Sequence, residues 1–235
     1  MEYELGYVAG ALCGDGCLVW NKNAGNYGIT LEVKDKDIAN YFSECLKTVI
    51  EKSVKTMIRK RTYNRAPYLT FVVYFYGKKE IKKLKDIYNN VNFGTFEWLP
   101  PNEAYNNKAF RQGFLRAFFD CEGTVRIRFR KRTSTRFEKI RNIRTQSANK
   151  NGLFEIKKLL ILENIPSIIY SSGKYHTLDI EGKQRLESFF KNIGFASKVK
   201  QEKLELAARF LTPEEKIKGY DAEEPLQESP DEIRH

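Results

Sequence analysis

The feature that most constrains this chain is an internal repeat. Two short apolar segments, Leu5–Gly16 and Phe110–Gly123, share one layout: small residues at helical spacing, then an acid followed by glycine. Their closing acids lie 107 positions apart, and a second matching pair, Leu84–Phe93 and Leu186–Phe195, recurs at an offset of 102. Self-similarity at a nearly constant spacing indicates a tandem duplication.

Each copy predicts the same order of elements: helix, two strands, helix, two strands, helix. We therefore expect an α+β fold of two pseudo-symmetric αββαββα halves with two antiparallel sheets. The expected units are a first half over 1–93, a linker over 94–107 with the Pro100-Pro101 stop, a second half over 108–212, and an acidic, poorly ordered tail over 213–235. The expected elements after the repeat helices are strands 17–22 and 27–33, helix 36–52 capped by Asp35, strands 54–63 and 68–76, helix 78–90, strands 124–131 and 141–148, helix 151–164, strands 167–172 and 175–181, and helices 183–193 and 198–210.

The small residues of the two repeat helices predict how these helices pack. Gly6, Gly10 and Gly14 recur every four residues and so share one helix face, which lets another backbone approach closely. Packing along these faces would bring Asp15 and Glu122 together. Two adjacent carboxylates repel each other, and a divalent cation relieves that repulsion. An oxygen-only ligand set favours Mg²⁺ over zinc. The alternative is a glycine-rich loop followed by an exposed turn acid, and the matched second copy disfavours it.

The segments Val8–Gly16 and Leu115–Gly123 resemble the two motifs of single-chain LAGLIDADG homing endonucleases of the archaeal intron-encoded type. The resemblance covers the chain to about Leu211 and implies a saddle over DNA, with the motif helices packed at the central interface. It also implies that Asp15 and Glu122 bind metal, joined by the backbone carbonyls of Gly14 and Cys121. The departures are Cys13 in place of an acid, a bulky Arg116, and Glu122 in place of aspartate.

Lys200 opens the last helix in a segment that resembles the family's active-centre lysine. We expect it to orient water or to stabilise the charge of the transition state, and the alternative is an ordinary helix-start lysine. Where the family often carries a polar side chain near the metal, this chain has Val33 and Ser147, and Val33 offers no polar group to order water in the first half.

The charge of the chain indicates a polyanionic partner. The whole chain carries +11, but the segment 213–235 has eight acids and three bases, so the first 212 residues carry +16. Alternation along the strand after Glu122 places Arg126, Arg128, Arg130 and Arg132 on one face, where strands of the family read the major groove. The first-half positions that correspond, Val19, Asn21 and Asn23, are uncharged, so the two half-sites should differ. The predicted DNA-binding residues are Asn21, Asn23, Arg59, Arg61, Arg65, Arg126, Arg128, Arg130, Arg132, Arg144, Tyr170, Ser172 and Lys174.

Other function classes are disfavoured by composition. Two histidines and four cysteines without a CxxC pair argue against a zinc site, a disulfide framework or a histidine triad. No apolar run approaches the roughly 18 residues of a membrane span, and no signal-peptide pattern opens the chain, so we expect a cytoplasmic protein.

The sequence thus predicts a monomeric, Mg²⁺-dependent endonuclease that breaks both strands of a long asymmetric DNA site of about 20 base pairs. Mn²⁺ is an alternative metal, and Ca²⁺ is expected to support binding without cleavage. The rival interpretation is a non-cleaving binder on the same scaffold, either an RNA maturase that acts on intron RNA or a DNA-binding regulator.

Overall fold

The computed structural model describes residues 1–89, 93, 97–131 and 137–209, with side chains described outside 129–139. The elements of the first half are α1 (Glu2–Cys13), β1 (Gly16–Asn21), β2 (Asn26–Val33), α2 (Lys36–Ile50), β3 (Lys55–Tyr63), β4 (Ala66–Tyr76) and α3 (Lys78–Ile87). Those of the second are α5 (Lys108–Glu122), β5 (Gly123–Lys131), β6 (Phe137–Ser147), α6 (Lys150–Leu162), β7 (Ile168–Ser172), β8 (Tyr175–Glu181), α7 (Lys183–Asn192) and α8 (Lys198–Ala208). The predicted acidic tail, 213–235, lies outside the described residues.

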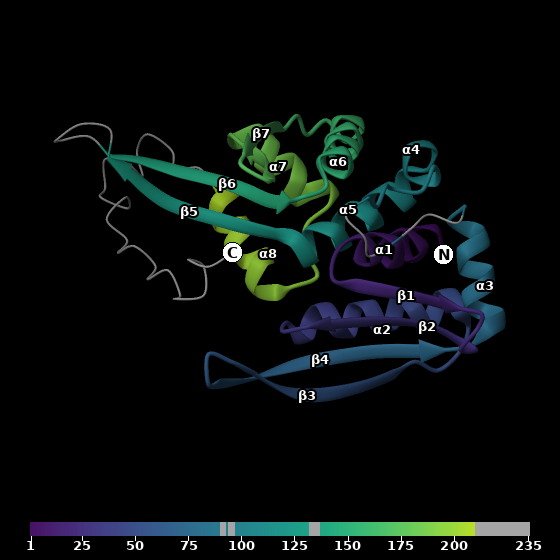
Figure 1. Ribbon diagram of the computed structural model, residues 1–235. Coiled ribbons are helices and arrows are strands. Elements are labelled where there is room, and N and C mark those ends of the chain that lie inside the picture. The colour runs from purple at the N-terminus through teal and green to yellow at the C-terminus, as the bar shows by residue number, and fades with distance from the viewer. Residues whose placement is uncertain (90–92, 94–96, 132–136, 210–235) are drawn as a thin grey trace.

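Each half forms one antiparallel sheet of the same topology. The strand orders are β1-β2-β4-β3 and β5-β6-β8-β7, and every described pairing within them is antiparallel. Figure 1 shows the two sheets on either side of the central pair α1 and α5, with the hairpins β3–β4 and β5–β6 both extending to the left. The predicted α+β fold of two αββαββα halves is therefore confirmed.

One face of each sheet packs on helices and the other is left open. In β2, Ile29, Leu31 and Val33 are buried in the hydrophobic core, which α2 lines with Ile38 and Phe42 among others. The residues between them on β2 point to the opposite face, because side chains alternate along a strand. The same alternation in β5 buries Val125 and turns Arg126 and Arg128 to the open face.

Most predicted boundaries fall within a few residues of the observed ones, and three differences are informative. The first motif helix ends at Cys13 rather than running through Asp15, so Asp15 lies in the turn before β1. β6 begins at Phe137 instead of Arg141, since pairing with β5 extends the strand through a basic stretch that has no strand pattern of its own. A short helix, α4 (Glu103–Asn106), lies in the expected linker.

Local signals explain the start of α2. The Asp35 carboxylate accepts hydrogen bonds from the backbone N–H groups of Asp37 and Ile38 at 2.8 and 3.4 Å, as the predicted cap requires.

Among the described residues, no helix combines the length and apolarity needed to cross a membrane.

Candidate active site and nucleic-acid interface

The two motif helices, α1 and α5, touch through their backbones. A Cβ added to Gly6 would lie 2.0 Å from the carbonyl oxygen of Phe110, and one added to Gly10 would lie 2.1 Å from that of Phe114. One added to Gly14 would lie 2.5 Å from the Cβ of Cys121. Because the partner positions rise together along both helices, the helices run parallel and their C-terminal ends meet.

Asp15 and Glu122 lie at these adjoining ends. Burial and, second, the negative charge of Asp15 raise the pKa of Glu122 to about 7, while the ammonium of Lys200 opposes the shift. Although part of the Asp15 side chain reaches solvent, the surrounding protein raises its pKa as well, and Lys200 again opposes the rise. The Asp15 carboxylate is thus close enough for its charge to disfavour the ionised form of Glu122.

Lys200 lies beside these acids. Its ammonium donates hydrogen bonds to the carbonyl oxygens of Asp120 at 2.6 Å and Gly123 at 2.7 Å, at the C-terminal end of α5. Burial lowers the pKa of Lys200, and the charges of Asp120 and Asp15 partly restore it. The structure therefore brings the three predicted catalytic residues into one cluster.

Asp120 fixes the segment from which Lys200 extends, and sequence reasoning did not assign it a role. Its buried carboxylate accepts hydrogen bonds from the Tyr7 hydroxyl at 2.8 Å and from the backbone N–H of Ala196 at 3.0 Å, just before α8 begins. Burial raises the pKa of Asp120 to about 6, against the effect of these hydrogen bonds. Arg116, whose size is unusual for the motif, donates to the carbonyl oxygen of Phe195 at 2.7 Å.

The donor set of this cluster fits a hard divalent cation. Asp15 and Glu122 supply carboxylate oxygens, and the predicted carbonyl donors of Gly14 and Cys121 are backbone oxygens at the same helix ends. Within the described part of the chain, no group of three or more His, Cys, Asp or Glu side chains could hold a metal. Two carboxylates would therefore be the side-chain ligands. Val33 is buried in the core and brings no polar group.

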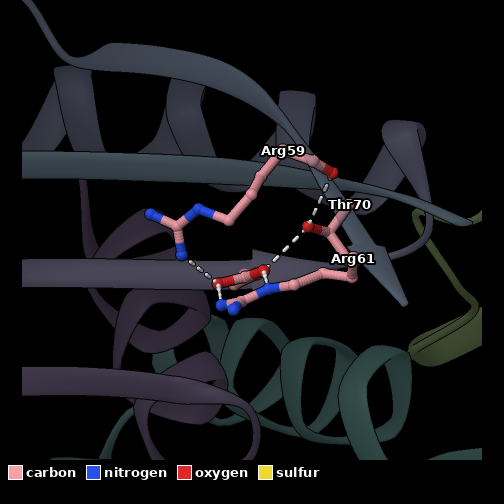
Figure 2. Close-up of polar contacts among 4 residues, drawn as sticks. Arg59, Arg61 and Thr70 are labelled. Atoms are coloured by element: carbon pink, nitrogen blue, oxygen red, sulfur yellow. Dashed lines mark hydrogen bonds and ion pairs between the residues drawn. The ribbon is translucent and has the colours of Figure 1, made fainter. Parts of the chain in front are cut away.

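On the open face of the first sheet, Arg59 and Arg61 converge on one carboxylate, as Figure 2 shows. That carboxylate belongs to Glu32 of β2, which also accepts a hydrogen bond from the Thr70 hydroxyl at 2.7 Å. These contacts lower the pKa of Glu32 to about 2, with the hydrogen bond from Arg61 as the largest cause. The two arginines are thus already paired within the protein.

The other predicted first-half contacts lie at turns. Asn21 ends β1, and its side-chain oxygen accepts the backbone N–H of Ala24 at 3.0 Å. Asn23 and Arg65 are exposed, and Arg65 has a positive φ of 66° in the turn between β3 and β4.

On the open face of the second sheet, Arg144 pairs with an acid of its own. Its guanidinium contacts Asp179 at 2.7 and 2.5 Å, and the Tyr170 hydroxyl donates to the same carboxylate at 3.0 Å. Ser172 and Lys174 are exposed at the end of the β7–β8 hairpin. Arg128 is exposed and Arg126 half-buried on this face; the Arg130 side chain and all of Arg132 lie outside the described residues.

Sequence reasoning missed both acids on the basic faces, Glu32 and Asp179. Strand alternation could have placed each on the open face. Their arginine partners depend on which residues lie opposite one another in the paired strands. The sequence does not predict this strand register.

The chain thus folds into two αββαββα halves that pack through parallel motif helices, with Asp15 and Glu122 at the adjoining ends. Residues 109–194 match the family model described as the LAGLIDADG-like domain. The second half is therefore similar to a LAGLIDADG-like domain, and the first half repeats its architecture. The resemblance drawn from the motifs is confirmed.

Solved structures share this fold. I-WcaI bound to its DNA recognition sequence superposes with a TM-score of 0.61 at 13% identity, covering 90% of this chain and 88% of that chain. The homing endonuclease I-DmoI in complex with DNA and Mn gives a TM-score of 0.54 at 14% identity, covering 82% and 96%. Full-length DUF199/WhiA from Thermatoga maritima gives a TM-score of 0.54 at 14% identity, covering 94% of this chain and 66% of that chain. At these identities the likeness shows the fold.

Relatives by sequence carry other names. A probable translation initiation factor IF-2 of Methanocaldococcus jannaschii is 27% identical over 215 residues, 84% of this chain but 15% of that protein. An uncharacterised protein of the same organism is 31% identical over 127 residues, 53% of this chain and 42% of that protein. The chain thus spans less than half the length of either relative.

Proposed function

We propose that this chain is a site-specific DNA endonuclease that hydrolyses one phosphodiester bond in each strand of a long asymmetric duplex. The observation that carries the proposal is the meeting of Asp15 and Glu122 at the adjoining ends of α1 and α5, where burial and the negative charge of Asp15 raise the pKa of Glu122 to about 7. Such a pair is stabilised by a bound cation. A divalent ion, when bound, would neutralise developing charge and lower the pKa of a water molecule.

The residues around this pair have separable tasks. Asp15 and Glu122 would hold the ion, with Mg²⁺ as the physiological metal, Mn²⁺ as an alternative and Ca²⁺ as a substitute for binding without cleavage. Lys200, held by two carbonyl oxygens, would place a positive charge beside the scissile phosphate. The open faces of both sheets would position the duplex, with Arg128 exposed for contact in the second half.

The solved neighbours support this assignment by analogy of fold. I-DmoI has been seen in complex with DNA and Mn and with DNA and Ca, and I-WcaI has been seen on its recognition sequence. We propose the same class of partner here: double-stranded DNA of about 20 base pairs, bound by a monomer.

The test starts from a randomised duplex library, because the target is unidentified. DNA retained by the protein in Ca²⁺ buffer is sequenced, and the consensus is cloned into a plasmid. Incubation with Mg²⁺ should linearise that plasmid, and incubation with EDTA should not. Asp15→Asn and Glu122→Gln should each abolish cleavage while binding in Ca²⁺ persists, since the sheet contacts are retained.

The same experiment distinguishes an endonuclease from a non-cleaving binder. Specific binding without cleavage in Mg²⁺ or Mn²⁺ would replace the endonuclease with a DNA-binding regulator. Preference for structured intron RNA over any duplex would indicate a maturase. Cleavage by either acid variant at the wild-type rate would remove that acid from the site.

A further inference from the structure

Glu32 is an acid at the centre of a surface that we propose meets a polyanion. It lies on β2 directly opposite Val72 of β4, with its carboxylate on the open face. A negative charge there repels DNA phosphates and reduces non-specific binding. Its presence calls for a role other than affinity.

Both carboxylate oxygens of Glu32 are occupied. Oε1 accepts from Arg61 Nε at 2.7 Å and from the Thr70 hydroxyl at 2.7 Å, and Oε2 accepts from Arg61 Nη2 at 2.7 Å and Arg59 Nη1 at 2.8 Å. Arg61 is therefore held bidentately, the strongest arrangement for this pair. The hydroxyl of Thr70 also lies 3.3 Å from the Arg59 carbonyl oxygen, which ties the cluster to the β3 backbone.

The cluster orders both arginines without burying them. Their side chains remain 40% and 46% exposed, and the contacts to Glu32 engage one side of each guanidinium (Figure 2). A guanidinium carries five N–H donors, so each arginine keeps others for a ligand. Holding the side chain in advance removes the loss of its rotamer entropy from the cost of binding.

We propose that Glu32 is a positioning residue that sets base preference in the first half-site by holding Arg59 and Arg61 in one arrangement over the sheet. An arginine fixed in place can meet a guanine edge bidentately, whereas an unfixed one reaches phosphates of any sequence. This proposal rests on the proposed DNA-binding function.

In the second half, a different acid holds an arginine in the same way. Asp179 of β8 is 3% exposed and holds Arg144 of β6 and the hydroxyl of Tyr170 on that open face. Register places Gln146, not an acid, at the position that corresponds to Glu32, because Leu31 pairs with Gly16 as Thr145 pairs with Gly123. Each half thus anchors arginine with its own acid.

The experiment compares four proteins: wild type, Glu32→Gln, Glu32→Asp and Glu44→Gln. Glu44 lies on α2, away from the open face, with its side chain 71% exposed and paired to Lys47, so its substitution makes the same change of charge elsewhere. Each protein selects from the randomised duplex library in Ca²⁺ buffer, and its affinity for a non-specific duplex is measured against salt. Urea unfolding checks that each variant folds.

Glu32→Gln should lower base preference in the first half-site by about 10-fold at the affected positions, the scale of one bidentate base contact. Its non-specific affinity should rise, with a salt slope steeper by about one unit. Glu32→Asp keeps the charge but shortens the reach, so it should lose base preference without that steepening. Glu44→Gln should keep the wild-type preference, and the second half-site should not change in any variant.

Unchanged first-half preference in both Glu32 variants would overturn the proposal and leave Glu32 as a cross-strand ion pair that affects stability alone. An equal change in base preference from Glu44→Gln would show that the Glu32 effect comes from net charge, and would overturn the positioning role. A wild-type protein with no sequence preference would instead refute the proposed function, and the positioning role with it.

Discussion

The two halves share one fold but end their motif helices differently. In the second half, buried Asp120 binds Tyr7 and the backbone before α8, and this holds the segment that carries Lys200. In the first half the matching position is Cys13, a buried thiol in the hydrophobic core. Lys200 is the cation that opposes the rise in pKa of both Asp15 and Glu122. Both halves therefore contribute an acid to the candidate site, whereas the second half alone contributes its lysine.

The open sheets differ in the same manner. The β5 strand presents Arg128 where the register of the first half presents Asn21, and the first-half arginines come from β3, paired with Glu32. A duplicated scaffold thus preserves the helix contact on which both halves depend. It diverges at the ends of the motif helices and on the open faces of the sheets.

The largest expected effect concerns Lys200. Lys200→Met should slow cleavage by about 10²-fold, the scale of losing one transition-state donor, with little loss of affinity in Ca²⁺. Because Lys200 is tied to the α5 end, one strand should be cut more slowly than the other, and nicked plasmid should accumulate. Gel analysis of supercoiled substrate measures this. Equal slowing of both strands would contradict the asymmetry, and a parallel loss of binding would make Lys200 a phosphate-positioning residue.

Substitutions at the helix contact should destabilise the protein equally, whether they are made on α1 or on α5. Gly10→Ala and Gly113→Ala each place a Cβ about 2.1 Å from a carbonyl oxygen of the opposite helix, at Phe114 and Tyr3 respectively. Each should lower the free energy of unfolding by about 1–3 kcal/mol, the usual cost of overpacking. Urea unfolding measures the change. In a helix with open space, glycine to alanine stabilises instead, so a gain in stability would show that the helices do not touch here.

Matched substitutions on the two sheets should have unequal effects on DNA binding. Arg128→Ala should cost about 1–3 kcal/mol on the selected site and relax one base position of the second half-site, if its fork meets a guanine. Asn21→Ala, the matched first-half change, should leave the salt slope as it is, because no charge is lost. Competition binding against single-base variants, repeated at several salt concentrations, measures both. Uniform weakening of all sequences by Arg128→Ala would instead indicate a phosphate contact.

The smallest effect concerns pH. The pKa of Glu122 is about 7 in the fold against 4.5 ordinarily, so ionisation costs stability in the folded state. Metal-free protein should therefore lose thermal stability as pH rises from about 4.5 to about 7. Glu122→Gln should flatten this decline, and Mg²⁺ should oppose it in wild type because it binds the ionised form. Thermal melts in EDTA and in Mg²⁺ test the sign; an identical decline in the variant would assign it to Asp120 or Asp15.

The features that repeat along the chain could be predicted from the residues alone. Glycines four residues apart share one helix face wherever the helix lies. Their spacing therefore predicted the parallel contact of α1 with α5. The Asp35 cap and the alternation of Val125, Arg126 and Ile127 are local in the same sense. Their geometry depends on the helical or strand period alone, and a linear sequence carries that period in full.

Partners that lie far apart in the chain could be identified only from the folded structure. Glu32 meets Arg59 and Arg61 only because β2, β4 and β3 pair in one register, and a shift of one residue would move Glu32 into the core. Asp120 meets Ala196 through the path of the chain between α7 and α8, and Lys200 reaches the end of α5 for the same reason. Such contacts depend on strand register and on the docking of α8, which are set by packing summed over many residues rather than by any local pattern.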